Sequence, residues 1–204
     1  MKTLQRSGAF AAFYLAIAYM IGIILFLVVL DYPSITDPAQ KVALLVEQQA
    51  MIFWTNLLMY VFFSLVLVVL ALALYDRLKE SAPALAQMAT VMAIIWAGSL
   101  VASGMVANAG IAPVLALYAQ DPAQAALTWQ GFETVASGLG NGNGEILGGV
   151  WTLLISLAAL RSGGLPKALN FLGLLVGSVG IVSILPGLTD LVGVFGLSQI
   201  IWFI

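Results

Sequence analysis

The side chains best suited to chemistry gather around one glycine- and asparagine-rich run, residues 138–145. Glu145 ends this run, and Asn141 and Asn143 alternate with its glycines. A carboxylate beside two amides can bind a cation, accept hydrogen bonds from a ligand, or pass protons. We therefore predict the main ligand-binding site here. The alternative is a carboxylate that only begins a helix, where the helix macrodipole favours negative charge.

The segment that follows Glu145 has a small, polar face. Thr152 and Ser156 stand seven and eleven residues after Glu145, within about 40° of one another on a helical wheel of 100° per residue. Gly148 and Gly149 lie near the same face, which favours close packing against another helix.

A second polar face is predicted between residues 49 and 64. Gln49, Asn56, Tyr60 and Ser64 are separated by seven, four and four residues, a helical spacing. In lipid such side chains turn towards protein, where they bond to a neighbouring helix or line a cavity reached from outside. We count Gln49, Asn56 and Tyr60 among the candidate ligand-binding residues.

Acid–base chemistry has few candidates. Histidine and cysteine are absent, which excludes catalytic triads that need them, thiolate or imidazole metal sites, and His- or Cys-ligated haem. Glu133 and Glu145 are the only acids that lie close together on flexible backbone in the segments predicted to lie outside, and the glycine loop between them lets them approach or stay apart. We add Glu133 to the ligand-binding candidates. We predict no catalytic residue, metal site or cofactor, and no enzymatic activity.

The composition predicts that these residues belong to a membrane protein. The chain has 204 residues, of which 62% are hydrophobic and 8% charged, whereas soluble domains carry about a quarter charged residues. So few charges cannot cover a water-facing surface, so membrane lipid is the expected surrounding. The net charge of −2 and the absence of a basic patch argue against nucleic acid as a partner.

The apolar segments predict an all-α fold, a polytopic membrane helix bundle with one transmembrane domain over residues 1–204. Charged, proline- and glycine-rich turns separate six spans. These spans are residues 8–30, 50–75, 83–107, 145–160, 168–185 and 191–204. Asn108, Gly110 and Pro113 are expected to disturb the end of the third span.

Two Asp-Pro pairs predict further helices between the spans. Asp37-Pro38 and Asp121-Pro122 each have the form of an N-cap followed by proline at the first helical position. They predict two amphipathic helices at the membrane interface, over residues 39–49 and 121–137. Trp54, Trp129 and Trp151 fit the aromatic belt of the same boundary.

The basic residues predict how the spans are oriented. Six of the seven lysines and arginines fall on one side of a six-span arrangement, and only Lys41 falls on the other. The positive-inside rule therefore places the N-terminus inside. The run at 138–145 and both interfacial helices then face outwards.

Three stretches resemble a known family. They are Asp121-Pro-Ala-Gln before a helix, Gly142-Asn-Gly-Glu-Ile-Leu-Gly-Gly-Val-Trp151 at the start of a span, and Arg161-Ser-Gly-Gly-Leu-Pro-Lys-Ala-Leu-Asn170 at the start of the next. Over about residues 120–185 the chain resembles a bacterial multi-pass membrane protein family catalogued only as a domain of unknown function. The resemblance implies a bacterial inner (cytoplasmic) membrane protein and no catalytic residues.

Two functions fit these observations. The first is a non-enzymatic accessory, assembly, or small-ligand- or lipid-binding protein with an outward-facing polar loop at 138–145. The alternative is a small oligomeric transporter or channel that uses Glu145 and the polar face of the second helix. Expected partners are membrane lipid and either further copies of the chain or a larger membrane complex.

Overall fold

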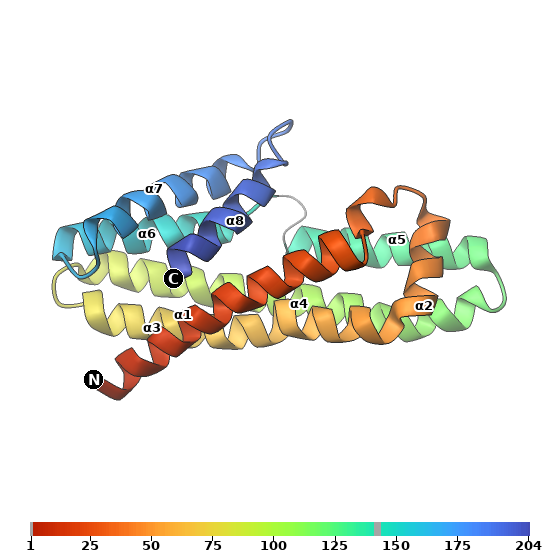
Figure 1. The fold of residues 1–204 in the computed structure, drawn as a ribbon, viewed down its shortest axis with the longest axis horizontal. Helices are drawn as coiled ribbons and strands as arrows, with labels where there is room; N and C mark the ends of the chain where they lie inside the picture. The colour runs from red at the N-terminus through yellow and green to blue at the C-terminus, as the bar shows by residue number, and fades with distance from the viewer. Residues whose placement is uncertain (1, 141–143) are drawn as a thin grey trace. The chain divides into compact units, whose positions relative to one another are not determined.

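The computed structural model describes residues 2–140 and 144–204, and every regular element within them is helical (Figure 1). The elements are α1 (Lys2–Ile23), η1 (Ile24–Val29), η2 (Tyr32–Ser34), α2 (Pro38–Asn56), η3 (Leu57–Phe62), α3 (Phe63–Leu78), α4 (Pro83–Tyr118), α5 (Pro122–Leu139), α6 (Ile146–Ser162), α7 (Lys167–Val182) and α8 (Leu191–Phe203). Here η1 and η3 are π-helical turns, and η2 is a 3-10 turn. The predicted all-α helical fold is confirmed.

Three helical stretches are long and apolar enough to cross a membrane, namely Thr3–Val29, Pro38–Leu78 and Pro83–Tyr118. Ile146–Ser162, Lys167–Val182 and Leu191–Phe203 are shorter apolar helices at the places of the last three predicted spans. Large apolar side chains on these helices are exposed, as lipid-facing residues are: Phe10 of α1, for example, is 78% exposed. The fold is that of a membrane protein, while the count of six spans and their orientation stay predictions.

The chain packs as two compact units. Unit 1 contains Met1–Ile17, Phe63–Gly98 and Asn141–Ile204, and unit 2 contains Ala18–Phe62 and Ser99–Gly140. Helices α1 and α4 contribute residues to both units. Each unit is described on its own below.

The two Asp-Pro helix starts are confirmed in unit 2. The Asp37 side chain accepts a hydrogen bond from the Ala39 backbone N–H at the start of α2, and Asp121 accepts one from the Gln124 N–H at the start of α5. Each carboxylate satisfies a backbone donor that has no partner within the helix, and the following proline needs none. The structure thus begins both helices where the sequence predicts.

The third predicted span is longer than expected, because α4 continues to Tyr118 with Pro113 inside it. Proline at this position removes one backbone hydrogen bond and crowds the preceding turn. Packing in unit 2 holds the helix together through this stretch. Val114 is fully buried in the core of unit 2, and Asn108 donates from Nδ2 to the Phe53 carbonyl at 3.2 Å. The prediction that the span ends near Ala107 is therefore wrong.

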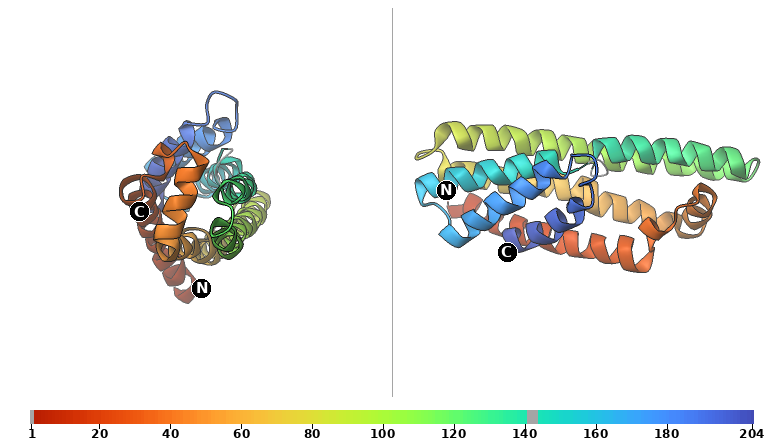
Figure 2. Two further views of the ribbon diagram at one scale, coloured as in Figure 1. Left: turned by 90° about the vertical axis from the view of Figure 1, so that its right-hand side faces the viewer. Right: turned by 90° about the horizontal axis from the view of Figure 1, so that it is seen from above.

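The helix that leads into the second predicted span bends at Gln48. Gln48 has non-helical dihedral angles (φ −116°, ψ 24°) inside α2, which changes direction there (Figure 1). The first part of α2 packs against α5, and α5 lies beside the second half of α4 (Figures 1 and 2). This packing brings the buried sides of α2, α4 and α5 together as the core of unit 2.

In unit 1, α6, α7 and α8 pack closely through small residues. A Cβ built on Gly149 of α6 would lie 2.7 Å from the Ile181 backbone nitrogen of α7, and one on Gly177 would lie 2.7 Å from the Gly149 carbonyl oxygen. The backbones of α6 and α7 therefore touch, and the close packing predicted for Gly149 is confirmed. The prediction that Trp151 belongs to an aromatic belt is wrong, because its side chain is fully buried beside Trp96 and Trp202. The same prediction is wrong for Trp129 in unit 2, which is 4% exposed.

Candidate functional site

Glu145 stands at the N-cap position of α6, in unit 1, with 3% of its surface exposed. Its backbone N–H donates to Ser183 Oγ at 2.9 Å, and Ser183 Oγ donates in turn to the Gly180 carbonyl at 2.7 Å. Ser183 is the C-cap of α7, so the first bond joins the start of α6 to the end of α7, and the second lies within the end of α7.

The turn before Glu145 requires glycine. Gly144 has a positive φ of 101°, and a Cβ built on it would lie 2.7 Å from the Ile184 backbone. Any side chain here would both strain the backbone and collide with the chain after α7. The glycine-rich sequence thus brings the Glu145 carboxylate into the interior, where no described basic side chain forms an ion pair with it. A buried carboxylate without a cation is costly unless a ligand or proton compensates it.

The predicted polar face of α6 is confirmed as a buried one. Thr152 and Ser156 have no exposed surface, and Thr152 Oγ1 donates to Gln199 Oε1 of α8 at 3.0 Å. The face formed by Glu145, Thr152 and Ser156 therefore points into unit 1, towards α7 and α8. The sequence prediction missed Gln199, although a strongly polar side chain in the apolar segment 191–204 is a signal for it.

The predicted polar face of the second helix is only partly formed. Asn56 is buried and donates from Nδ2 to Asn108 Oδ1 of α4 at 2.9 Å. Tyr60 is half-buried against Gly104, whereas Gln49 is exposed. Gln49 directly follows the break in α2 at Gln48. Asn141 and Asn143 lie outside the described residues.

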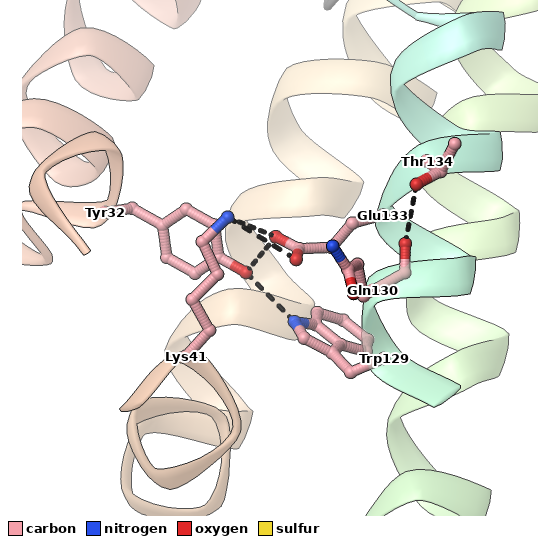
Figure 3. A network of polar contacts seen from close by, with 6 residues as sticks. All are labelled: Tyr32, Lys41, Trp129, Gln130, Glu133 and Thr134. Carbon is pink, nitrogen blue, oxygen red and sulfur yellow. Dashed lines mark hydrogen bonds and ion pairs between the residues drawn. The ribbon is translucent and has the colours of Figure 1, made fainter. Parts of the chain in front are cut away.

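Glu133 belongs to unit 2, whereas Glu145 belongs to unit 1. Glu133 Oε1 accepts a hydrogen bond from the Tyr32 hydroxyl at 2.5 Å, and Lys41 Nζ lies 3.2 Å from the same oxygen (Figure 3). The Trp129 indole N–H donates to the Tyr32 hydroxyl at 3.0 Å. The Lys41 ammonium also lies 5.0 Å from the centre of the Tyr32 ring, a cation–π distance.

These four residues, the Glu133 network, connect three separate elements. Tyr32 comes from η2, Lys41 from the first turns of α2, and Trp129 and Glu133 from successive turns of α5 (Figure 3). Thr134, also drawn there, bonds only within α5, to the Gln130 carbonyl. The sequence offered one signal for this network: Lys41 is the single basic residue among the predicted outer segments, and a lone cation favours a nearby acid.

The network keeps Tyr32 protonated. Burial, followed by the negative charge of Glu133 and the hydrogen bond to it, raises the Tyr32 pKa far above its ordinary value of 10.0. The hydroxyl therefore acts as a permanent donor to Glu133 at physiological pH. The same hydroxyl accepts a hydrogen bond from the Trp129 N–H, so it acts both as a donor and as an acceptor.

The raised Tyr32 pKa predicts loss of stability in alkali. The unfolded chain releases this proton as the pH rises through about 10, whereas the folded protein keeps it. The stabilisation is complete below about pH 10 and falls above it, by at most about 1.4 kcal/mol per pH unit. Denaturant unfolding between pH 8 and pH 11 gives the free energy of unfolding of the wild type and of Tyr32→Phe. The wild type should lose its advantage over Tyr32→Phe as the pH rises above about 10. A difference between the two proteins that does not change with pH would contradict the raised Tyr32 pKa.

No group of three or more acidic side chains in the described parts of the chain could hold a metal ion. Glu145 in unit 1 is a buried carboxylate. In unit 2, both carboxylate oxygens of Glu133 are bound by neighbouring side chains.

The family comparison covers almost the whole chain. The model of a domain of unknown function, DUF4386, matches residues 9–203. This confirms the resemblance seen at residues 120–185 and extends it to the N-terminal half. Comparisons with curated proteins and with solved structures give no match. With its apolar helices and this match from residue 9 to residue 203, the chain belongs to the DUF4386 family.

Proposed function

We propose that this protein is a non-enzymatic integral membrane protein that binds a small ligand at the Glu145 end of the polar face of α6. The observation that carries this proposal is the burial of the Glu145 carboxylate without an ion pair from any described basic residue. An acid in an apolar interior favours a partner that donates a hydrogen bond or carries positive charge. The ligand would therefore present an ammonium, hydroxyl or amide group to Glu145.

The surroundings of Glu145 support a binding role over a purely helix-starting one. The Glu145 side chain makes no capping hydrogen bond to α6. A carboxylate that only begins a helix gains its stability from the exposed first turn and from solvent, whereas Glu145 is turned inwards. The bonds from Glu145 through Ser183 to Gly180 hold it there.

The second polar helix gives the transporter alternative less support. Asn56 of α2 donates to Asn108 of α4, Asn108 donates in turn to the Phe53 carbonyl, and the Gln49 side chain is exposed. These are the features of helix packing, in which a polar pair joins two neighbouring helices. A binding protein therefore accounts better for the polar face of the second helix. It would work alone, as several copies, or within a larger membrane complex.

We further propose that the protein lies in a bacterial inner membrane with its N-terminus inside. The distribution of the basic residues supports this orientation, because Lys41 alone falls on the opposite side. In that arrangement α5 and the start of α6 face outwards, and the ligand would reach Glu145 from that side.

The role of Glu145 is tested by Glu145→Gln, which keeps the shape of the side chain but removes its charge. Wild-type and variant proteins are purified from the same native membranes, and species bound without covalent linkage are identified by native mass spectrometry. A hydrogen bond to a charged group contributes about 1.5–3 kcal/mol, so we expect occupancy of the bound species to fall roughly 10- to 100-fold.

Glu47→Gln is the matched control, because Glu47 is exposed on α2. It should keep the wild-type occupancy. Equal occupancy in the wild type and Glu145→Gln, with both proteins folded, would overturn the proposal.

A further inference from the structure

Unit 1 has a basic surface at the end where α3 stops and α6 turns into α7 (Figure 1). Residues 76–80 and 161–167 there contain four basic side chains and two acidic ones. One of the acids, Asp76, is paired with Lys79 at 2.6 Å. The other three basic side chains are exposed, and none forms an ion pair with a described acid. We call them the basic cluster: Arg77, Arg161 and Lys167.

One contact draws the basic cluster together. Arg77 Nε, at the end of α3, donates to the Gly164 carbonyl at 2.7 Å, in the turn between α6 and α7. Gly164 stands three residues after Arg161 and three before Lys167, so the Arg77 guanidinium lies at the turn that joins them. Packing supports this contact, because a Cβ built on Gly164 would lie 2.7 Å from Leu78 Cδ2. The bond positions the guanidinium and leaves its two terminal nitrogens available to another acceptor.

The chemistry of the basic cluster selects an anion with several oxygens. A guanidinium offers paired N–H groups that match the geometry of a phosphate, and a lysine ammonium adds a second charge with its own donors. Basic residues at the inner ends of membrane helices are expected from topology alone. What distinguishes this cluster is that Arg77 is held at the turn between the other two cations and is not paired with an acid.

An apolar face of α7 leads away from the basic cluster. Lys167, Phe171 and Leu175 are spaced by four residues, so they lie on one side of the helix. Phe171 is 62% exposed and Leu175 is 63% exposed, whereas Gly177, on the opposite side, packs against α6. In a membrane such an exposed apolar face meets acyl chains. A molecule that carries both a phosphate and an acyl chain therefore matches both parts of this surface, whereas a soluble phosphate matches only one.

We propose that the basic cluster binds the phosphate group of an anionic membrane phospholipid, with one acyl chain along Phe171 and Leu175 of α7. Both parts of the site are exposed, so lipid reaches it without any separation of the helices. In the orientation proposed above this end faces inside, the side on which basic residues of membrane proteins bind anionic headgroups. The site shares no residue with the Glu145 site, so the result of Glu145→Gln does not decide it.

The test compares two lipids that have the same acyl chains. The purified full chain, in detergent at low ionic strength, is mixed with equal amounts of anionic dioleoyl phosphatidylglycerol and zwitterionic dioleoyl phosphatidylcholine. Native mass spectrometry measures which lipid stays bound. Each basic residue near an anionic headgroup contributes about five-fold in affinity, so the cluster predicts a preference for phosphatidylglycerol on the order of 100-fold. Equal retention of the two lipids by the wild type would overturn the proposal.

Two variants assign the preference to the basic cluster. Arg77→Gln and Lys167→Gln each remove one charge from an exposed side chain, and each should lower the preference for phosphatidylglycerol about five-fold. Lys41→Gln is the control, because it removes the same charge from unit 2 and should keep the wild-type preference. A preference that is unchanged in both folded cluster variants would contradict the assignment.

Glycerol 3-phosphate separates a lipid site from a site for free phosphate. It carries a phosphate group without acyl chains, so a ten-fold excess over phosphatidylglycerol, at the same ionic strength, should leave the bound lipid in place. Displacement of the lipid by this excess would show that phosphate alone occupies the basic cluster, and the assignment to a lipid would then be wrong.

Discussion

Replacing Gly149 with alanine is expected to lower the free energy of unfolding by about 3 kcal/mol, because one added methyl group would collide with backbone rather than with a movable side chain. The built Cβ lies 2.7 Å from the Ile181 nitrogen, 2.8 Å from the Gly177 carbonyl oxygen and 2.9 Å from the Gly180 carbonyl carbon. Helix α7 would have to move away from α6 as a whole. Unfolding in increasing SDS, followed by circular dichroism, measures the loss.

Gly177→Ala should have a similar effect from the other side of the same contact. Its built Cβ would lie 2.7 Å from the Gly149 carbonyl oxygen and 2.8 Å from the Leu153 nitrogen. Because the two glycines face each other, the losses should not add: one displacement of α7 relieves both collisions. The double variant is therefore expected to be only slightly less stable than either single variant.

Two helical glycines in open surroundings provide the controls. A Cβ on Gly98 of α4 or on Gly193 of α8 would meet nothing within 4 Å. Alanine is the better helix former, so Gly98→Ala and Gly193→Ala should raise stability by about 0.5–1 kcal/mol. If Gly149→Ala behaves like these controls, α6 and α7 do not approach each other as closely as described.

The second large effect is expected for Glu133→Ala in unit 2. This change leaves the Tyr32 hydroxyl and the Lys41 ammonium without their shared acceptor. Both members of the ion pair keep about a quarter of their side-chain surface exposed, at 25% and 22%, so solvent weakens the loss. We expect the free energy of unfolding to fall by about 1–3 kcal/mol, measured in the same SDS titration.

Related variants separate the hydrogen bond from the ion pair. Glu133→Gln keeps an acceptor for Tyr32 and loses only the charge, so it should lower the free energy of unfolding by about 1 kcal/mol or less.

A double-mutant cycle between Glu133→Ala and Lys41→Met gives the coupling energy of the two side chains directly. A coupling energy near zero would show that the network does not hold η2, α2 and α5 together. Glu47→Gln again serves as the control, since a change at an exposed site should stay within about 0.5 kcal/mol.

The features that the sequence predicts correctly depend on short-range patterns. Asp37 and Asp121 each bond to a backbone N–H only two or three residues later, so the local sequence is enough to place both helix starts. The apolar runs predict the helices for the same reason. The face of Glu145, Thr152 and Ser156 follows from helical spacing alone, and its burial follows from the cost of exposing polar groups to lipid.

What only the tertiary structure decides is which residues distant in sequence meet. Lys41 and Glu133 come together through the packing of α2 on α5, and Thr152 meets Gln199 because α8 packs beside α6. Packing likewise overrides local preference at Pro113, where α4 continues, and buries Trp151 where its sequence position suggests an interfacial residue. Local propensities amount to a few tenths of a kcal/mol per residue up to about 3 kcal/mol for proline. Burial of a large side chain is worth about 1.5–3 kcal/mol at each of many positions, so tertiary packing decides wherever the two disagree.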